Sequence, residues 1–192
     1  PSWFSVALTR PASVIMSELS KKRRAKLQKT LNDTYGYQDH RDEDVEVREA
    51  GPHGRGLFAA RQFTPGEIIV EINGQLHRQT EYAGSLFVME LDTEWLLEPD
   101  IPGCFVNHSC NPNSELIPFS KHSLGLVAIC NIEPGIEIGY DYQWPAKKWV
   151  PHCHCKSPTC RGWMVAADQV EKMKRLVSEK KRAKKKKSKP RR

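Results

Sequence analysis

From Val45 onward the chain consists of short apolar or alternating runs separated by Gly, Pro and Asn. Runs of this length, with turn-forming residues between them, are typical of β-strands rather than helices. No helix-length stretch lies between them to carry a crossover connection, which argues against a doubly wound α/β fold. We therefore predict one compact, mostly β body made of several small sheets. The runs are VEVRE, GLFAA, EIIVEI, SLFVMEL, EWLLE, SELIPF, LGLVAIC and IEIGYDY.

Segments of a different character flank this body. Residues 17–32 read as a short basic helix that ends near Gly36. After residue 164, apolar residues return at helical spacing and predict a C-terminal helix that frays into a lysine-rich tail. The predicted organisation is an N-terminal extension at 1–44, the β body at 45–145, a cysteine-rich segment at 146–165, and a helix with a disordered tail at 166–192.

The formal net charge of +7 is unevenly distributed along the chain. Residues 180–192 contain ten Lys or Arg and no acid, and residues 1–29 are also basic, so the body between them is acidic. An acidic body suits a basic protein or peptide partner better than a nucleic acid lying across it. The lysine-rich tail is open to three interpretations: nonspecific nucleic-acid contact, a nuclear localisation signal, or a solvated tail.

The sequence has no run that approaches the roughly 18 apolar residues needed to cross a bilayer. Its N-terminus also lacks the charged start and long apolar stretch of a secretory signal. We therefore expect a soluble protein that is not secreted and has no membrane partner. Its expected location is nuclear in a eukaryote, and cytoplasmic or nucleoid-associated otherwise.

Cys153, Cys155 and Cys160 in CHCKSPTC lie too close together to act as independent core residues. Thiolates that surround one Zn²⁺ at about 2.3 Å need such crowding, and a reducing compartment makes the alternative of paired disulfides less favourable. A closed site of four thiolates would be structural, because zinc would keep no open position for a substrate. The candidates for the fourth ligand are the nearby His152 and His154 and the distant Cys110.

Three other motifs carry polar or flexible residues in unusual places. GPHGRGLFAAR has closely spaced glycines that allow a tight turn and a close approach to a ligand, although such a turn alone is more often an ordinary hairpin. NHSCNPN, residues 107–113, follows an apolar CFV and reads as a buried polar loop or as an Asx turn with a core histidine. In GYDYQW, Tyr140 and Tyr142 project to the same face, either as core residues or as a channel wall.

The order of these four signals resembles the SET-domain family of protein-lysine methyltransferases, over roughly residues 45–163. The combination is much more specific than any one of its members. The resemblance implies a SET fold of several small sheets with a knot-like crossing of the C-terminal segment, which would be an exception to the rule against threaded chains. It further implies a SET domain at 45–145 and a post-SET zinc segment at 146–165.

The resemblance also assigns the cofactor and metal residues. The GxG loop would hold the methionine part of S-adenosylmethionine through backbone contacts, and the Asn-His pair would contact the same cofactor. An apolar residue of the C-terminal flap would pack near the adenine, and a cysteine after the Asn-His pair would complete the zinc site. The cofactor residues are His53, Gly54, Arg55, Gly56, Asn107, His108, Tyr142 and Trp163, and the Zn²⁺ ligands are Cys110, Cys153, Cys155 and Cys160.

Tyr142 matches the catalytic tyrosine of the family and would position the substrate amine at the methyl-transfer point. A neutral lysine amine must reach the methyl group in line with the departing thioether, so a narrow dry channel helps through orientation and desolvation. Tyr140 falls where family members carry Phe or Tyr, a choice that resembles a switch for product state. The resemblance therefore implies mainly mono- or dimethylation, with Tyr140 and Tyr142 as the catalytic residues.

This sequence departs from the family at three points. Cys104 lies at or near the place of an arginine that usually precedes NHSC, and no cysteine cluster precedes residue 45. The stretch between the GxG loop and NHSC is short, and it offers only Tyr82 as a tyrosine for the second aromatic of a lysine channel. These differences bear on the choice of substrate, and the chain resembles a minimal member without a pre-SET segment.

The favoured function is methyl transfer from S-adenosylmethionine to a lysine of a basic protein, with a histone or histone-like tail as the expected substrate. Residues 184–189 are a hypothetical automethylation target. The alternative is a catalytically silent SET-like module that binds a basic partner through its acidic face. A zinc-containing nucleic-acid binder is a third interpretation, but the cysteines lack paired CxxC spacing and the body is acidic.

Overall fold

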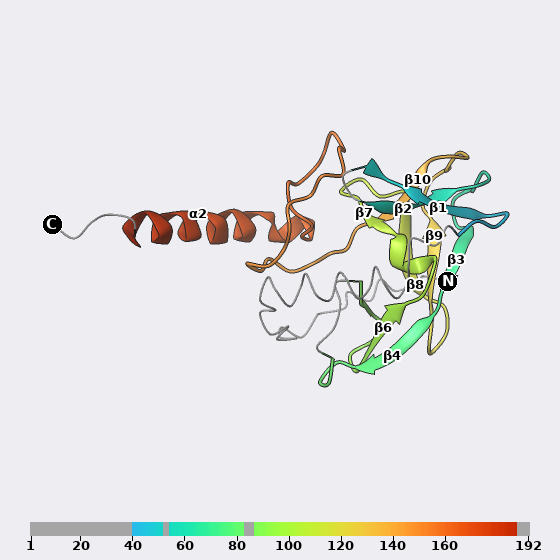
Figure 1. Cartoon of the computed structure of the whole chain (residues 1–192), viewed down its shortest axis with the longest axis horizontal. Helices are drawn as coiled ribbons and strands as arrows, with labels where there is room; N and C mark the ends of the chain where they lie inside the picture. The colour runs from blue at the N-terminus through green and yellow to red at the C-terminus, as the bar shows by residue number, and fades with distance from the viewer. Residues whose placement is uncertain (1–39, 52–53, 83–86, 188–192) are drawn as a thin grey trace, which may run out of the picture.

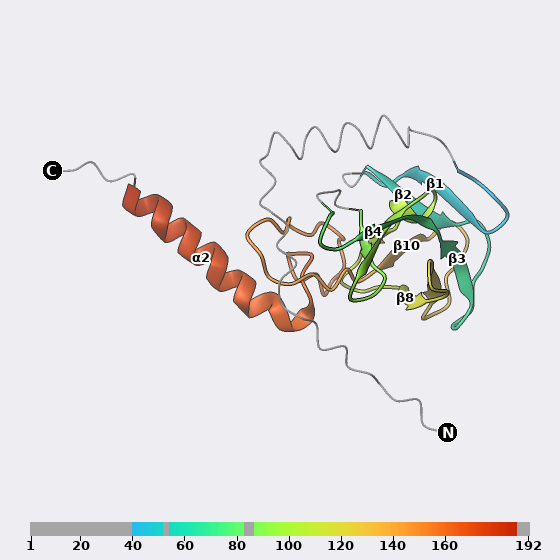
Figure 2. The same ribbon diagram turned by 90° about the horizontal axis from the view of Figure 1, so that it is seen from below.

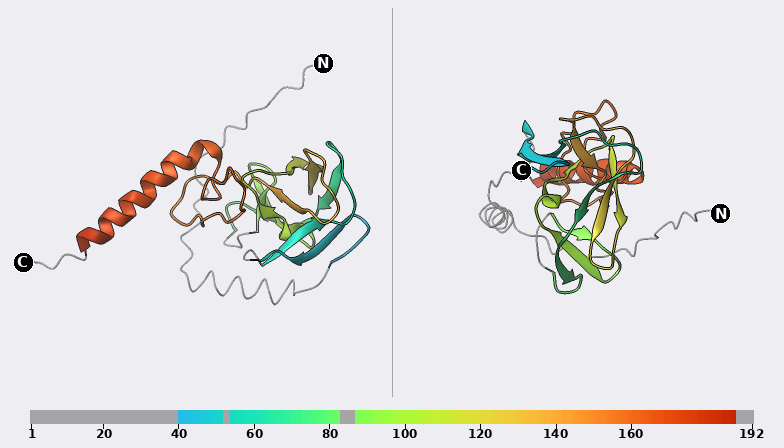
Figure 3. Two further views of the ribbon diagram at one scale, coloured as in Figure 1. Left: turned by 90° about the horizontal axis from the view of Figure 1, so that it is seen from above. Right: turned by 90° about the vertical axis from the view of Figure 1, so that its right-hand side faces the viewer.

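The computed structural model describes residues 40–51, 54–82 and 87–187, with side chains through residue 179. Figure 1 shows a body of small sheets from which one long C-terminal helix projects, and Figures 2 and 3 show the same separation from other sides. The mostly β prediction is therefore confirmed. The basic helix predicted at 17–32 and the tail beyond residue 187 lie outside the described residues.

Within the described part of the chain, the strands form three small sheets. The first sheet has the order β1 (Val45–Glu49), β2 (Arg55–Ala59), β10 (Glu137–Tyr140) and β7 (Asn107–His108). The second has the order β3 (Ile68–Ile72), β9 (Leu124–Ala128) and β8 (Ser114–Pro118). The third has the order β4 (Gly74–Arg78), β6 (Trp95–Pro99) and β5 (Met89–Glu90).

Most of these strands coincide with the predicted runs, and two differences have physical reasons. Strand β4, GQLHR, was not predicted, because its mostly half-exposed residues show no strong apolar alternation. It pairs with β6 along its whole length, so the partner strand compensates for its weak local preference. The run SLFVMEL yields only the two-residue β5 among the described residues, and its start at residues 85–86 lies outside them.

The main core lies between the sheets and is built from the apolar faces of their strands. All five residues of β9 are buried, because this strand is central in its sheet and covered on both sides. The side chains of Phe63, Leu57 and Ile138 are fully buried beside it. This core fixes the first and second sheets against each other, and the site described below lies at its edge.

The central strand β10 pairs with β2 antiparallel and with β7 parallel. In the parallel pair, Gly139 lies opposite Asn107 and Tyr140 lies opposite His108. Parallel neighbours cannot be joined by a tight hairpin, and the connection here runs through β8 and β9. Strand β10 therefore lies against the start of the NHSCNPN segment, where the resemblance implied that the C-terminal segment crosses the chain.

Two polar side chains hold β10 from the start of β8. The Nδ2 of Asn113 donates to the carbonyl oxygen of Glu137 at 2.9 Å, and its Oδ1 accepts the N–H of Gly139 at 2.9 Å. The Oγ of the buried Ser114 donates to the carbonyl oxygen of Gly139 at 3.0 Å. Side chains thus take the place of a further paired strand along this part of β10.

A second, smaller core holds the C-terminal helix α2 (Val170–Lys187), which follows the short 3₁₀ turn η3 (Ala167–Gln169). Met173 and Val165 are buried in this core, and three tryptophans pack against it. The helix continues to Lys187, so it enters the lysine-rich segment further than the apolar spacing alone indicated. None of the helices in the described part of the chain is long and apolar enough for a membrane crossing.

Replacing Asn113 tests the support of β10. Asn113→Ala removes two hydrogen bonds and leaves two backbone groups of β10 without their partners, so we expect unfolding to cost about 2 kcal/mol less than in the wild type. Urea denaturation measures the free energy of unfolding. The matched control is Asn111→Ala at an exposed position, where the change should stay within about 0.5 kcal/mol. Equal effects of the two changes would contradict the proposed support.

Candidate functional site

The segments at β7 and β10 form a partition between two pockets. Tyr140 and Tyr142 line the first pocket, whereas Glu137 and Gly139 line the second. This division follows from the alternation of side chains along an extended chain. Val106 likewise faces the first pocket, and its neighbour Asn107 faces the second. Groups in the two pockets are thus separated by little more than the backbone of these segments.

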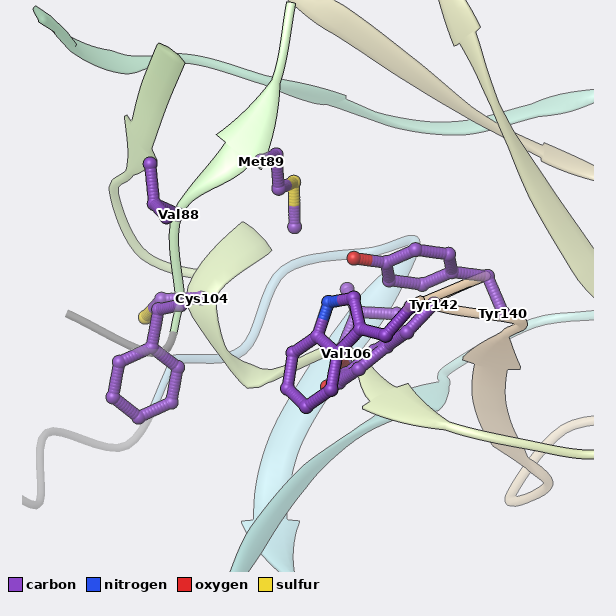
Figure 4. A pocket seen from close by; sticks show the side chains of 8 residues that line it. Val88, Met89, Cys104, Val106, Tyr140 and Tyr142 are labelled. Atoms are coloured by element: carbon purple, nitrogen blue, oxygen red, sulfur yellow. The ribbon is translucent and has the colours of Figure 1, made fainter. Parts of the chain in front are cut away.

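The first pocket is narrow and largely aromatic (Figure 4). Its volume of about 20 Å³ has room for about one water. In Figure 4 the hydroxyl of Tyr140 points toward the side chain of Met89. The pocket is lined by Phe87, Val88, Met89, Cys104, Val106, Tyr140, Tyr142 and Trp144.

Tyr142 is held by hydrogen bonds from both its side chain and its backbone. Its hydroxyl donates to the carbonyl oxygen of Val106 at 2.9 Å, and its N–H donates to the Nδ1 of His108 at 3.2 Å. The ring centroids of Tyr140 and Trp144 lie 4.8 Å and 4.9 Å from its own. Burial raises the pKa of Tyr142 well above its ordinary value, so the phenol stays neutral.

The second pocket is larger, with a volume of about 260 Å³, and most of its lining residues have polar side chains. Asn107 lies at its base, where its Nδ2 donates to the carbonyl oxygen of Arg55 at 3.0 Å and to the Oε1 of Glu137 at 2.8 Å. The remaining walls come from the loop after β7, from Cys155 and Lys156 of the cysteine-rich segment, and from Ala50. The pocket is lined by Ala50, Asn107, His108, Ser109, Asn111, Asn113, Ile136, Glu137, Gly139, Cys155 and Lys156.

The GxG loop packs against two residues that line this pocket, and its two glycines have different roles. Gly54 has φ +81°, a left-handed conformation that favours glycine. At Gly56 a Cβ atom would lie 2.6 Å from the Oε1 of Glu137 and 2.9 Å from the Nδ2 of Asn107, so no side chain fits there. The predicted close approach at this loop is thus an approach to two side chains at the base of the pocket.

Cys110, Cys153, Cys155 and Cys160 form one cluster, with all four sulfur atoms within 4.8 Å of one another. The Sγ atoms of Cys110 and Cys153 are 3.7 Å apart, and none of the four is in a disulfide. Tetrahedral Zn²⁺ with bonds of about 2.3 Å separates its sulfur ligands by about 3.8 Å, so the cluster fits this ion. Among the local and distant candidates for the fourth ligand, the structure brings in Cys110 and leaves His152 and His154 outside.

Backbone N–H groups point at three of these sulfurs. The N–H of Arg161 donates to Cys110 at 3.4 Å, and those of Cys155 and Gly162 donate to Cys153 and Cys160 at the same distance. Burial raises the pKa of the Cys110 and Cys153 thiols. At Cys155 burial acts in the same direction, but backbone hydrogen bonds outweigh it and lower the pKa to about 7.

An ion pair joins the cysteine cluster to the segment that carries Tyr142. The guanidinium of Arg161 donates to both carboxylate oxygens of Asp141, at 2.7 Å and 2.6 Å. The two side chains are 14% and 12% exposed, so water screens this pair little. Because the backbone of Arg161 also contacts Cys110, one residue connects the cluster with the neighbour of Tyr142.

His108 lines the second pocket and contacts both the cysteine cluster and Tyr142, and its side chain is fully buried. Its Nε2 is 3.3 Å from the Sγ of Cys110, and its ring centroid is 5.2 Å from that of Tyr142. Burial lowers the pKa of His108 to about 4, and the nearby Arg161 lowers it further while Asp141 opposes the shift. The imidazole is therefore neutral at physiological pH.

Several predicted residues lie elsewhere. Trp163 packs against His152, with ring centroids 5.5 Å apart, and is not a lining residue of either pocket. His53 lies outside the described residues. Tyr82 packs against His77 at 4.8 Å and does not line the first pocket, whereas Phe87 does.

Other residues of the site were not predicted from the sequence. Glu137 and Ile138 alternate in IEIGY like any half-buried strand, so nothing marked Glu137 as a pocket residue. Arg161 stands directly after the last cysteine, and only this position pointed to it. Cys104 lines the first pocket, where its thiol offers a small, weakly polar wall.

Comparison with known proteins identifies the fold and the family of the central part. The family described as SET domain matches residues 54–143. Histone-lysine N-methyltransferase trithorax of Drosophila virilis is 30% identical over 152 residues, which are 71% of this chain and 4% of that protein. Histone-lysine N-methyltransferase set-2 of Caenorhabditis elegans is 31% identical over 129 residues, or 58% of this chain and 9% of that protein. The chain thus spans a small part of these relatives.

Solved structures share the fold. KRYPTONITE in complex with mCHG DNA and SAH has a TM-score of 0.55 and 22% identity, and the match covers 62% of this chain and 28% of that chain. KRYPTONITE in complex with mCHH DNA, H3(1-15) peptide and SAH matches equally well, over 29% of its length. The several small sheets predicted from the sequence are those of a known fold.

The cysteine cluster generates a prediction about metal content. The purified chain should contain about one Zn²⁺, and Cys153→Ser should lose most of it, because a hydroxyl is a poor replacement for a buried thiolate ligand. Metal analysis by mass spectrometry measures the ratio of zinc to protein. Cys130→Ser is the matched control, since Cys130 is exposed and lies outside the cluster. Zinc retained by Cys153→Ser, or lost by the control, would contradict the assignment.

Proposed function

Residues 54–143 form a SET domain, and on that premise we propose that this chain transfers a methyl group from S-adenosylmethionine to a lysine side chain of a basic protein. One observation carries the proposal: β10 and the residues directly after it present Tyr140 and Tyr142 to a narrow pocket with aromatic walls, and Glu137 and Gly139 to a larger pocket. A reaction between two molecules that enter from opposite sides needs two pockets that meet at the reacting atoms. Tyr142 of the first pocket lies beside His108 of the second, with ring centroids 5.2 Å apart.

The second pocket is the proposed cofactor site. Asn107 and Glu137 line it, and the amide oxygen of Asn107 and the carboxylate of Glu137 can accept from the ammonium group of S-adenosylmethionine. The KRYPTONITE structures contain SAH, which supports a cofactor of this class. The predicted contact of Trp163 with the adenine stays a prediction, because this residue does not line the pocket. The role of His53 also stays a prediction.

The first pocket is the proposed lysine channel. When bound, S-adenosylmethionine supplies a methyl group on a positively charged sulfur. Transfer of this methyl group to the amine leaves the sulfur as a neutral thioether. The aromatic walls exclude water and favour the neutral amine, which is the nucleophile. Tyr142 stays neutral and is fixed by Val106, so its ring and hydroxyl can hold the amine in line with the methyl group. No covalent bond to the protein is needed.

The cysteine cluster would serve as a closed, structural Zn²⁺ site. The four thiolates would leave the ion no open position for a substrate, so the metal would take no part in the chemistry. Its proposed role is to hold residues 153–162 against the second pocket, to which Cys155 and Lys156 contribute walls. Loss of the metal would therefore open the cofactor site from one side.

The proposed substrate is a histone or histone-like tail, in keeping with the names of the relatives and with the H3(1-15) peptide in one KRYPTONITE complex. The small volume of the first pocket and the hydroxyl of Tyr140 support mono- or dimethylation over trimethylation. The proposed location is the nucleus. Contact of the lysine-rich tail with nucleic acid, and its automethylation, stay predictions.

A catalytically silent module that binds a basic partner remains the alternative function. Tyr142 distinguishes the two. Tyr142→Phe removes only the hydroxyl that donates to Val106, so methyl transfer should fall by about 100-fold or more through lost orientation, while cofactor binding stays close to the wild type. Transfer of label from S-adenosylmethionine to histone H3 measures the first, and calorimetry with S-adenosylhomocysteine the second. Wild-type protein that binds the cofactor but transfers no methyl group would support the silent module.

Tyr140 gives a prediction about product state. Tyr140→Phe removes a hydroxyl from the narrow pocket and should raise the product by one or two methyl groups, because the space for a methylated amine grows. Mass spectrometry of the product peptide counts the methyl groups. Val88→Ala is a matched control that enlarges a different part of the same pocket. Predominant trimethylation by the wild type would contradict the assignment of Tyr140.

A further inference from the structure

One side chain connects the cysteine cluster with the catalytic tyrosine. The Nε2 of His108 lies 3.3 Å from the Sγ of Cys110, and its Nδ1 lies 3.2 Å from the backbone nitrogen of Tyr142. Both ring nitrogens are thus used, and the side chain has no exposed surface. A core histidine that merely fills space needs no such pair of partners.

The backbone of Tyr142 determines which nitrogen carries the proton. A backbone N–H can only donate, so the Nδ1 of His108 must accept and cannot be protonated. A neutral imidazole then carries its proton on Nε2, which faces Cys110. The contact with sulfur is therefore an N–H···S hydrogen bond in which the histidine donates. A thiolate bound to a metal ion is a good acceptor for this bond.

We propose that His108 is a positioning residue that fixes Tyr142 relative to the metal-bound thiolate of Cys110. The metal cluster would hold the imidazole through Nε2, and the imidazole would hold the start of the Tyr142 residue through Nδ1. The effect on methyl transfer rests on the function proposed above. The hydrogen bond to Cys110 does not, because it concerns only the metal site.

Arg161 forms a second connection between Cys110 and the segment that contains Tyr142. Arg161 contacts Cys110 through its backbone N–H and holds Asp141 with two hydrogen bonds. Asp141 and Tyr142 are neighbours, so both links end on the same short segment. Cys110 thereby anchors this segment from two directions, and His108 is the link that acts on Tyr142 itself.

Two substitutions separate the two hydrogen bonds of His108. The amide of Asn reaches the place of Nδ1, so His108→Asn keeps an acceptor for Tyr142 and loses the donor to Cys110. The amide of Gln reaches the place of Nε2, so His108→Gln keeps a donor to Cys110 and loses the acceptor. His122→Asn, at an exposed histidine outside both pockets, is the control.

The metal arm uses Co²⁺ in place of Zn²⁺, because the cobalt–thiolate charge-transfer band reports on hydrogen bonds to sulfur. In His108→Asn the band should move to longer wavelength, and zinc release to a chelator should become about tenfold faster. In His108→Gln and His122→Asn both readouts should match the wild type. An unchanged band and release rate in His108→Asn would overturn the proposed bond to Cys110.

The catalytic arm uses the zinc-loaded full chain with histone H3 as substrate. His108→Gln should lower kcat by about tenfold with little change in the KM of the peptide, since only the placement of Tyr142 is affected. When zinc is saturating, His108→Asn should lower kcat less than His108→Gln does, because it keeps the acceptor for the N–H of Tyr142. If both variants had the same decrease in kcat and the same increase in the rate of zinc release, His108 would only fill space, and the proposal would be wrong.

A measurement on the unaltered protein covers the case in which these variants fail to fold. NMR of chains labelled with ¹⁵N-histidine should find one buried histidine protonated on Nε2 and unprotonated on Nδ1. A proton on Nδ1 would overturn the inference. If the wild type transfers no methyl group, the proposed function fails, whereas the cobalt and NMR results still decide the role of His108 at the metal site.

Discussion

The parallel pairing of β10 with β7 is the constraint on which the rest of the site depends. It places Tyr140 beside His108 and Gly139 beside Asn107, although these pairs are more than thirty residues apart in sequence. The hydrogen bonds from Asn113 and Ser114 keep β10 in this position. Because neighbouring side chains of β10 face opposite sides, a single strand supplies walls to both pockets.

The cysteine cluster brings together two segments that lie even further apart in sequence. Cys110 belongs to the loop after β7, whereas the other three cysteines follow β10, so a bound Zn²⁺ would tie the two ends of the partition together. Arg161 and His108 extend this closure to Asp141 and Tyr142. In the proposed mechanism a bound metal ion would be remote from the reacting atoms, yet it would influence their placement through these two hydrogen-bonded links.

The sequence predicts the mostly β fold, the small sheets and the crowding of three cysteines, because strand length, turn residues and close spacing are local properties. The fourth cysteine, Cys110, is distant in sequence and was assigned only through the resemblance to the family. The sequence does not predict the role of Glu137 or the ion pair of Arg161 with Asp141, since both depend on which segments meet in three dimensions. Tyr82 illustrates the same limit, because position relative to a motif cannot say which way an aromatic side chain points. Phe87 lines the pocket instead.

The central claim is that cofactor and lysine enter from opposite sides of the partition formed by β7 and β10. A crystal structure of the zinc-loaded chain with S-adenosylhomocysteine and a histone H3 peptide tests it most directly. We expect the cofactor product in the pocket lined by Asn107 and Glu137, and a lysine in the pocket lined by Tyr140 and Tyr142. Both ligands on the same side of β10, or the cofactor product outside the polar pocket, would contradict it.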